Sequence, residues 1–354
     1  MKITHDDDVQ IKKVYLEFTQ RCNLDCTSCF RQNWDFPQTQ MTQEIFERCL
    51  NDLKTIPSLE EIIIGGIGEP TIHPKFKEWI RQLPNVKLTL TTNGFSWDDE
   101  MIDLFVSRFH QIVVSIDGLD DTFKLIRNFK LTQLEANIQR LIKIRKEKKQ
   151  AFPFMVAQIV ISEYNVDEIT PLIKRIAKAG FMKVILSNLL PQNYLDRDKI
   201  LYKVHDNQRM KTLKNTWLNT ALSNKIQIIF PNFELKTERR CIFVEDGTMT
   251  INSDGQIAPC YRFAHPSVEY VFNRRKEVYP HYYGQVLDDT ISSIWHSKLY
   301  TDLRLQNLRN RFPSCPDCDL VDACDYVNDS LCDCLGQNPS CADCLWTRHF
   351  IQCI

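Results

Sequence analysis

The stretch VYLEFTQRCNLDCTSCF, residues 14–30, decides the fold, because in it a short apolar strand runs directly into a loop with three cysteines. Residues 14–19 are β-branched, aromatic or otherwise largely apolar, as in a strand that is buried on both faces. Cys22, Cys26 and Cys29 follow at once. Three thiolates on one tight loop suit a polynuclear iron–sulfur centre, and they leave one iron open to a substrate or cofactor.

Similar strand-like runs recur up to residue 187, and amphipathic helical stretches such as residues 134–145 and 169–179 separate them. Alternating strands and helices predict an α/β fold with a parallel sheet and right-handed crossovers. Six such units predict a partial (β/α)6 TIM-like barrel, whose chemistry lies at the carboxyl ends of the strands. The further runs are residues 61–65, 87–92, 111–116, 155–160 and 183–187.

The last third of the chain is rich in cysteine: of 14 cysteines in the sequence, ten lie from Cys241 to Cys353. Residues 248–251 and 256–258 flank the polar turn Asn-Ser-Asp-Gly and predict a hairpin. We therefore expect a barrel over residues 1–205, a bridging segment over 206–240 with a helix near 210–222 and a strand near 226–230, and a cysteine-rich domain over 241–354. Cys49 stands alone and is expected to be a small buried residue.

The overall composition excludes several classes of partner. Apolar residues make up 43% of the chain, and the formal net charge is −1, so nothing points to nucleic acid or to an anionic membrane. The amino terminus is acidic and polar, unlike a signal peptide, and no apolar stretch approaches the ~20 residues that span a bilayer. We expect a cytoplasmic protein, and in a reducing compartment clustered cysteines usually bind metal.

Residues 16–30, with the aromatic Phe30 after the third cysteine, closely resemble the signature loop of radical S-adenosylmethionine (SAM) enzymes. The resemblance implies that Cys22, Cys26 and Cys29 hold a [4Fe–4S] cluster whose open iron binds SAM. One electron would then break SAM into methionine and a 5′-deoxyadenosyl radical, which abstracts hydrogen from a substrate. The hard chemistry would belong to the cofactor, while the protein positions it and excludes water.

The same resemblance implies a SAM-binding set at the ends of strands two to four. Residues 65–70 look like the glycine-rich segment that receives the SAM amino group, with an extra Ile-Gly relative to the commonest form. Residues 91–94 and 115–118 match the motifs that end strands three and four, and an arginine follows in an Ile-Arg pair. The expected set is Gly65, Gly66, Gly68, Glu69, Thr92, Asn93, Ser115, Asp117 and Arg127.

The late cysteines closely resemble those of a SPASM domain, which usually carries two auxiliary [4Fe–4S] clusters. The matching pattern is Cys241-x13-Gly255-x4-Cys260, followed by Cys315-x2-Cys318-x5-Cys324, but Asn328 stands where another cysteine is usual. Three of the remaining five would complete two clusters, and the sequence leaves open which. The candidates are Cys332, Cys334, Cys341, Cys344 and Cys353. A zinc site made of Cys315, Cys318, Cys341 and Cys344 is the alternative.

Residues 187–191 and 334–346 further resemble a subgroup of maturases of tungsten-cofactor oxidoreductases. The resemblance implies a pterin cofactor or a protein as the substrate, and a ferredoxin or flavodoxin as electron donor. The rivals are a maturase that cross-links a ribosomally made peptide and, in a different class, an electron-transfer or zinc-binding protein without SAM chemistry. No general base is assigned: Tyr261 and Asp246 are candidates, each with a structural role as the alternative.

Overall fold

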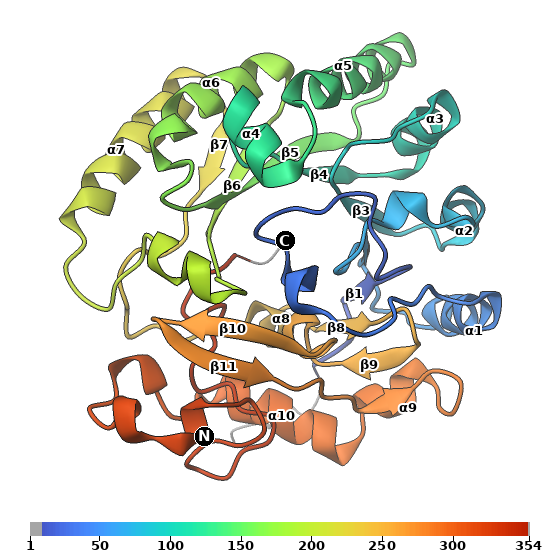
Figure 1. The fold of residues 1–354 in the computed structure, drawn as a ribbon. Helices are drawn as coiled ribbons and strands as arrows, with labels where there is room; N and C mark the ends of the chain where they lie inside the picture. Colours follow the sequence, from blue (N-terminus) through green and yellow to red (C-terminus); the bar gives the residue numbers. More distant parts are fainter. Residues whose placement is uncertain (1–8, 353–354) are drawn as a thin grey trace, which may run out of the picture.

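The predicted barrel strands all form in the computed structural model, which describes residues 9–352 (Figure 1). They lie in sequence order in one parallel sheet, with Leu16 beside Ile64 at the end of the first pair. The bridging segment adds a further parallel strand beside the sixth. The strands are β1 (Lys13–Leu16), β2 (Glu61–Ile64), β3 (Lys87–Thr92), β4 (Gln111–Ser115), β5 (Phe154–Ile161), β6 (Lys183–Asn188) and β7 (Gln227–Ile229).

Helices cover the outer face of this sheet and bury their apolar sides against it (Figure 1). Side-chain caps fix where some begin: Thr42 accepts from the Ile45 amide before α1, and Asp98 accepts from the Met101 amide before α3. Gly180, in the left-handed region at φ 97°, ends α6. The helices are α1 (Gln43–Leu53), α2 (Phe76–Gln82), α3 (Asp99–Arg108), α4 (Asp120–Arg127), α5 (Leu131–Glu147), α6 (Ile169–Ala179) and α7 (Gln208–Ser223).

The cysteine-rich part extends the barrel sheet. Its first hairpin forms as predicted, and β8 pairs in parallel with β1, so that Ile251 lies beside Leu16. The sheet order is β12-β9-β8-β1-β2-β3-β4-β5-β6-β7, which places β1 inside the sheet. The remaining elements are α8 (Ile242–Glu245), β8 (Thr248–Ile251), β9 (Gln256–Ala258), β10 (Ser267–Val271), β11 (Arg274–Val278), β12 (Gly284–Gln285), α9 (Ile291–Trp295) and α10 (Lys298–Leu308).

Strand alternation decides where the cavity lies. Side chains two residues apart share one face of a strand, and the inner face starts with an apolar layer that includes Tyr15, Val113 and Ile185. Two residues further toward the carboxyl ends, the same face turns polar. Residues of this second layer are Glu17, Ser115, Gln158 and Ser187, and they line a cavity. The apolar layer thus closes the floor of the barrel and leaves a polar chamber above it.

No helix within residues 9–352 combines the length and the apolar character needed to span a membrane.

Candidate active site

The cavity at the carboxyl ends of the strands has a volume of about 310 Å³ and is lined by both parts of the chain. The barrel contributes the cysteine loop, the glycine-rich segment after β2 and the ends of β3 to β6. The cysteine-rich part contributes Tyr261, Arg262, His265 and Trp346 to the opposite wall. The chamber is therefore completed only when the two parts of the chain come together.

The cysteine loop presents three thiols to this cavity. Cys22, Cys26 and Cys29 all line it and are partly exposed. Backbone amides donate to the sulfur atoms of the first and third cysteines: the Leu24 amide lies 3.4 Å from Cys22 Sγ, and the Arg31 amide lies 3.5 Å from Cys29 Sγ. The loop is thus shaped by hydrogen bonds to the sulfur atoms themselves.

Two N–H donors lie near sulfur atoms of the cysteine loop. Burial raises the pKa of the Cys26 thiol to about 11, the Arg127 guanidinium lowers it, and the neighbouring Cys29 and Cys22 raise it further. Arg127 Nη1 lies 3.8 Å from Cys26 Sγ, and Asn93 Nδ2 lies 3.7 Å from Cys22 Sγ. Metal coordination deprotonates thiols outright, so three soft donors beside two N–H groups fit an iron–sulfur cluster.

The glycine-rich segment packs too closely for side chains. A Cβ on Gly68 would stand 2.2 Å from the Thr19 carbonyl oxygen, and Gly66 has φ +119°. Gly66 and Gly68 line the cavity, whereas Gly65 packs against Thr91 of β3, where a Cβ would lie 2.3 Å from the hydroxyl oxygen. Glycine is needed because a side chain at these positions would collide with neighbouring atoms. Residues 66–68 line the cavity.

Glu69 lines the cavity and organises the strand ends beside it. The buried carboxylate accepts from the Thr71 amide and hydroxyl, from Thr92 Oγ1 at 2.9 Å and from the Asn93 amide at 2.7 Å. Burial raises its pKa, while these hydrogen bonds lower it. The Thr92 hydroxyl is engaged in the same network, and the Asn93 amide group remains at the cavity beside Cys22.

Asp117 lies behind the cavity wall and holds Arg127. Its Oδ2 accepts from Arg127 Nε at 2.6 Å, and its Oδ1 accepts from the Val160 amide at 2.7 Å. Arg127 and Ser115 line the cavity, but Asp117 is not among the described residues that do so. The structure thus places the Asp117 carboxylate against the Arg127 guanidinium, and whether Asp117 contacts SAM stays a prediction.

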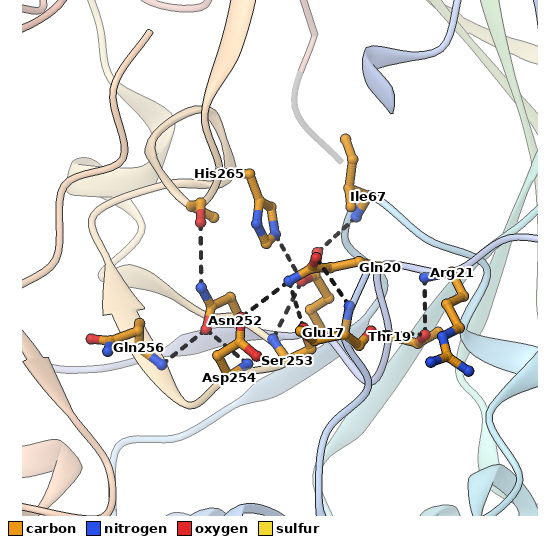
Figure 2. A network of polar contacts seen from close by, with 12 residues as sticks. Glu17, Thr19, Gln20, Arg21, Ile67, Asn252, Ser253, Asp254, Gln256 and His265 are labelled. Carbon is orange, nitrogen blue, oxygen red and sulfur yellow. Dashed lines mark hydrogen bonds and ion pairs between the residues drawn. The ribbon is translucent and has the colours of Figure 1, made fainter. Parts of the chain in front are cut away.

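A buried Glu17–His265 pair joins the two walls of the cavity, and sequence reasoning missed it (Figure 2). Glu17 Oε1 lies 2.8 Å from His265 Nε2, and its Oε2 accepts from the Ile67 amide at 2.8 Å. The Ser253 amide also donates to this carboxylate. One side chain therefore connects β1, the glycine-rich segment and the cysteine-rich part. The residues are distant in sequence, and no motif signals the pairing.

The turn between β8 and β9 holds the start of the cysteine loop. Gln20 Nε2 donates to Ser253 Oγ at 3.0 Å and to Asp254 Oδ2 at 3.2 Å (Figure 2). Asn252 in turn fixes the hairpin by accepting from the Asp254 and Gln256 amides. The cysteine-rich part thus positions the loop that carries the first three cysteines.

The two candidate bases differ in position. The Tyr261 ring lines the cavity, and its hydroxyl oxygen accepts a hydrogen bond from Trp346 Nε1. Asp246 forms an ion pair of 2.7 Å with Lys13, at the amino end of β1, the opposite end from the cavity. Of the two candidates, the structure thus brings Tyr261, and not Asp246, to the cavity.

Four of the late cysteines, three of them half-buried and Cys344 buried, lie in one group. Burial raises the pKa of Cys241 well above its usual value, and the charges of the Cys260, Cys341 and Cys344 thiolates raise it further, as expected for neighbouring thiols. Cys241 and Cys260 also pack against Tyr15 of the barrel floor. We call these four the inner group, and their number and chemistry fit a four-iron cluster.

A second group lies nearer the surface. Burial raises the pKa of Cys315 to about 12, and the thiolates of Cys334 and Cys324 contribute to the rise. Cys318 is exposed on the same loop. We call Cys315, Cys318, Cys324 and Cys334 the outer group, and they again offer four thiols. Cys332 donates instead to the Asp333 carbonyl oxygen, and Cys353 lies outside the described residues.

The two cysteine pairs of the zinc alternative lie on neighbouring segments, since the Cys315 amide donates to the Ala342 carbonyl oxygen at 3.3 Å, but their thiols have different neighbours. Cys341 and Cys344 lie with Cys241 and Cys260, whereas Cys315 lies with Cys324 and Cys334. No three His, Cys, Asp or Glu side chains within residues 9–352 meet closely enough to coordinate a single metal ion. The same is true of Cys22, Cys26 and Cys29, and a cluster does not require the thiols to meet at a single ion.

Comparison with known families now defines the class. Residues 16–202 match the model of the radical SAM superfamily, and residues 241–319 match the SPASM iron–sulfur cluster-binding domain. The first match covers more than half of the chain, and this protein belongs to the radical SAM superfamily. It is a radical SAM enzyme with a SPASM domain, of a class that binds a [4Fe–4S] cluster, SAM and auxiliary iron–sulfur clusters.

Among individual proteins, the chain is 36% identical to the tungsten-containing aldehyde ferredoxin oxidoreductase cofactor-modifying protein of Pyrococcus furiosus, over 97% of each chain. Two solved structures share the fold at 15–17% identity. SuiB of Streptococcus suis bound to precursor peptide SuiA matches with a TM-score of 0.62, over 90% of this chain and 73% of that one. Native anSMEcpe with bound SAM matches with 0.60, over 96% and 94%.

Proposed function

We propose that this enzyme takes part in maturation of a tungsten-containing oxidoreductase, by modifying its pterin cofactor or its polypeptide. The observation that carries the proposal is the 36% identity, over 97% of both chains, to a protein named for modifying such a cofactor. Because the match covers nearly the whole chain, it includes the SAM motifs and also the opposite cavity wall with Tyr261, His265 and Trp346.

When bound, the cluster and SAM supply a 5′-deoxyadenosyl radical that takes a hydrogen atom from the substrate. In this proposal Cys22, Cys26 and Cys29 hold the cluster. Arg127, aimed by Asp117, binds the SAM carboxylate with two N–H groups. The backbone at residues 66–68 receives the amino group, and Tyr261, His265 and Trp346 cover the substrate side of the cavity.

We further propose that the inner and outer cysteine groups each hold an auxiliary [4Fe–4S] cluster. The inner group then uses Cys341 and Cys344 to replace the cysteine missing at position 328. A ferredoxin or flavodoxin would supply the electron, and the cytoplasm, where thiols stay reduced, is the compartment that we expect.

The test uses anaerobically reconstituted enzyme, SAM, a reductant and a tungsten oxidoreductase obtained without this enzyme. We expect 5′-deoxyadenosine to form in step with a mass change in the extracted pterin or in the oxidoreductase polypeptide. The Cys22→Ala/Cys26→Ala/Cys29→Ala variant is the control and should give neither product. Nucleoside formation with no change in cofactor or polypeptide would reject the tungsten substrate while leaving the radical chemistry intact.

The second candidate is maturation of a ribosomally made peptide. It rests on the fold shared with SuiB, whose structure contains a precursor peptide. A peptide cross-link appears as a loss of two mass units per bond formed, in contrast to a change in the pterin. The same reaction with a small cysteine-containing precursor peptide therefore separates the two candidates.

A further inference from the structure

A network of four charged side chains lies inside the cysteine-rich part. Arg262 pairs with Glu269 and lies 3.8 Å from Asp343, and Lys276 Nζ lies 3.1 Å from Asp343 Oδ2. Each of the four side chains is at most 2% exposed. Desolvating two cations and two anions is costly, and replacing such networks by apolar residues often stabilises a protein. Stability alone therefore does not explain why these four charged side chains are buried together.

One end of the network faces the inner cysteine group. Arg262 follows Cys260 by two residues, and Asp343 stands between Cys341 and Cys344. Both charged residues therefore lie on the two segments that carry three of the four inner cysteines.

The Arg262 guanidinium has a spare donor at this end. Its Nη1 is buried and has no hydrogen-bond partner among the described residues. A buried guanidinium N–H without a partner is costly, and sulfur atoms of a cluster are acceptors that would satisfy it. Arg262 thus carries an unused charged donor two residues from Cys260.

The other end faces the outer group. Lys276, on β11, donates to the Val327 carbonyl oxygen at 3.3 Å and to that of Asp329, and Val327 packs against Cys315 and Cys324. Ala342, the chain neighbour of Asp343, packs with Cys315, and the Cys315 amide donates to the Ala342 carbonyl oxygen at 3.3 Å. Asp343 therefore lies within electrostatic reach of both cysteine groups, with one cation on each side of it.

We propose that Asp343 is a shared anion that couples the reduction potentials of the two auxiliary clusters, while Arg262 tunes the inner cluster and Lys276 the outer one. The inference rests on the two ligand sets proposed above. Charge acts strongly in a dry interior, and an anion near a cluster disfavours the added electron. Removing Asp343 should therefore raise both potentials, whereas removing Lys276 should lower mainly the outer one.

The test is a redox titration followed by electron paramagnetic resonance on the full chain that carries Cys22→Ala/Cys26→Ala/Cys29→Ala, so that only auxiliary clusters contribute. Cys344→Ser and Cys324→Ser assign the signals to the inner and outer groups. Asp343→Asn keeps the side-chain shape, and we expect both midpoint potentials to rise. Lys276→Gln should lower the outer potential more than the inner one. Asp302→Asn, in the exposed pair with Lys298, is the matched control and should move neither.

Iron content separates the possible failures. About eight irons per chain, four for each cluster, must be present before the charges are changed. Fewer in the starting variant would overturn the ligand sets and this inference with them, whereas SAM cleavage by the wild type is measured independently. Full iron with unmoved potentials in Asp343→Asn overturns the coupling alone. If Asp343→Asn loses iron, Lys276→Gln decides, because a merely structural network predicts no selective shift of the outer cluster.

Discussion

The two cysteine regions of this enzyme are built in opposite ways. The first three cysteines lie within eight residues, on one loop that lines the cavity. The inner group is gathered from residues 241 to 344 and packs half-buried against the barrel floor, whereas the outer group lies within residues 315 to 334 and has two exposed thiols. The site that must admit SAM is thus built by one local loop, whereas the inner group depends on segments that are distant in sequence.

Loss of the local site should have the largest effect. In the Cys22→Ala/Cys26→Ala/Cys29→Ala variant we expect 5′-deoxyadenosine formation to fall to background and iron to fall by about four per chain, one cluster's content. Chromatography of the quenched reaction and iron analysis measure both. Cys49→Ala, at a fully buried cysteine on α1, is the control and should keep the activity. Nucleoside from the triple variant would contradict the assignment.

Among the late cysteines, Cys344 is predicted to be a cluster ligand and Cys332 is predicted not to be one. Cys344→Ser removes one of the four thiolates of the inner group and should cost about four irons and most of the activity, since the auxiliary cluster then loses a ligand that no SAM molecule replaces. Cys332→Ser, at the thiol that bonds to a backbone carbonyl, should retain full iron. Iron and sulfide content after reconstitution decide the point, and equal losses in both variants would reject the grouping.

A smaller effect is expected where Arg127 meets SAM. Arg127→Lys keeps the charge but loses the planar fork, and we expect SAM to bind about 10-fold more weakly. Equilibrium dialysis of the reconstituted enzyme measures the affinity. Arg175→Lys is the matched control, because Arg175 pairs with Asp120 and Glu135 away from the cavity. Unchanged affinity in Arg127→Lys would mean that the SAM carboxylate binds elsewhere.

The smallest predicted effect concerns the joint between the two regions. Glu17→Met leaves the Ile67 amide and the His265 ring without their acceptor, and should lower the free energy of unfolding by about 1–3 kcal/mol. Asp246→Asn removes the half-exposed pair with Lys13 and should cost about 0–1 kcal/mol. Denaturant titrations compare the two variants. Equal losses would show that Glu17 does not join the regions.

The local features of the fold were predictable from the sequence. The barrel strands were correct because β-branched runs buried on both faces leave a strong local pattern. The hairpin of β8 and β9 was correct because its polar turn is marked by Asn252 and Gly255. The pairing of β8 with β1 carried no such signal, since more than 200 residues separate the two strands.

The site residues show the same contrast between local motifs, which the sequence reveals, and long-range contacts, which it does not. The SAM motifs indicated the wall that Ser115 and Arg127 form, but not that Asp117 stands behind Arg127. His265 was missed because its partner Glu17 lies 248 residues away. The choice among late cysteines also depends on tertiary packing, which a spacing pattern does not encode.

The position of β1 has a consequence for how the chain folds. It is the first strand to be synthesised, yet one of its two neighbours, β8, comes more than 200 residues later. Until then the edge of β1 offers unpaired amide and carbonyl groups, which are a template for aggregation. Closing so long a loop is also entropically slow. A barrel expressed without residues after 240 should therefore associate through this edge, and production of the enzyme should depend on chaperones until β8 arrives.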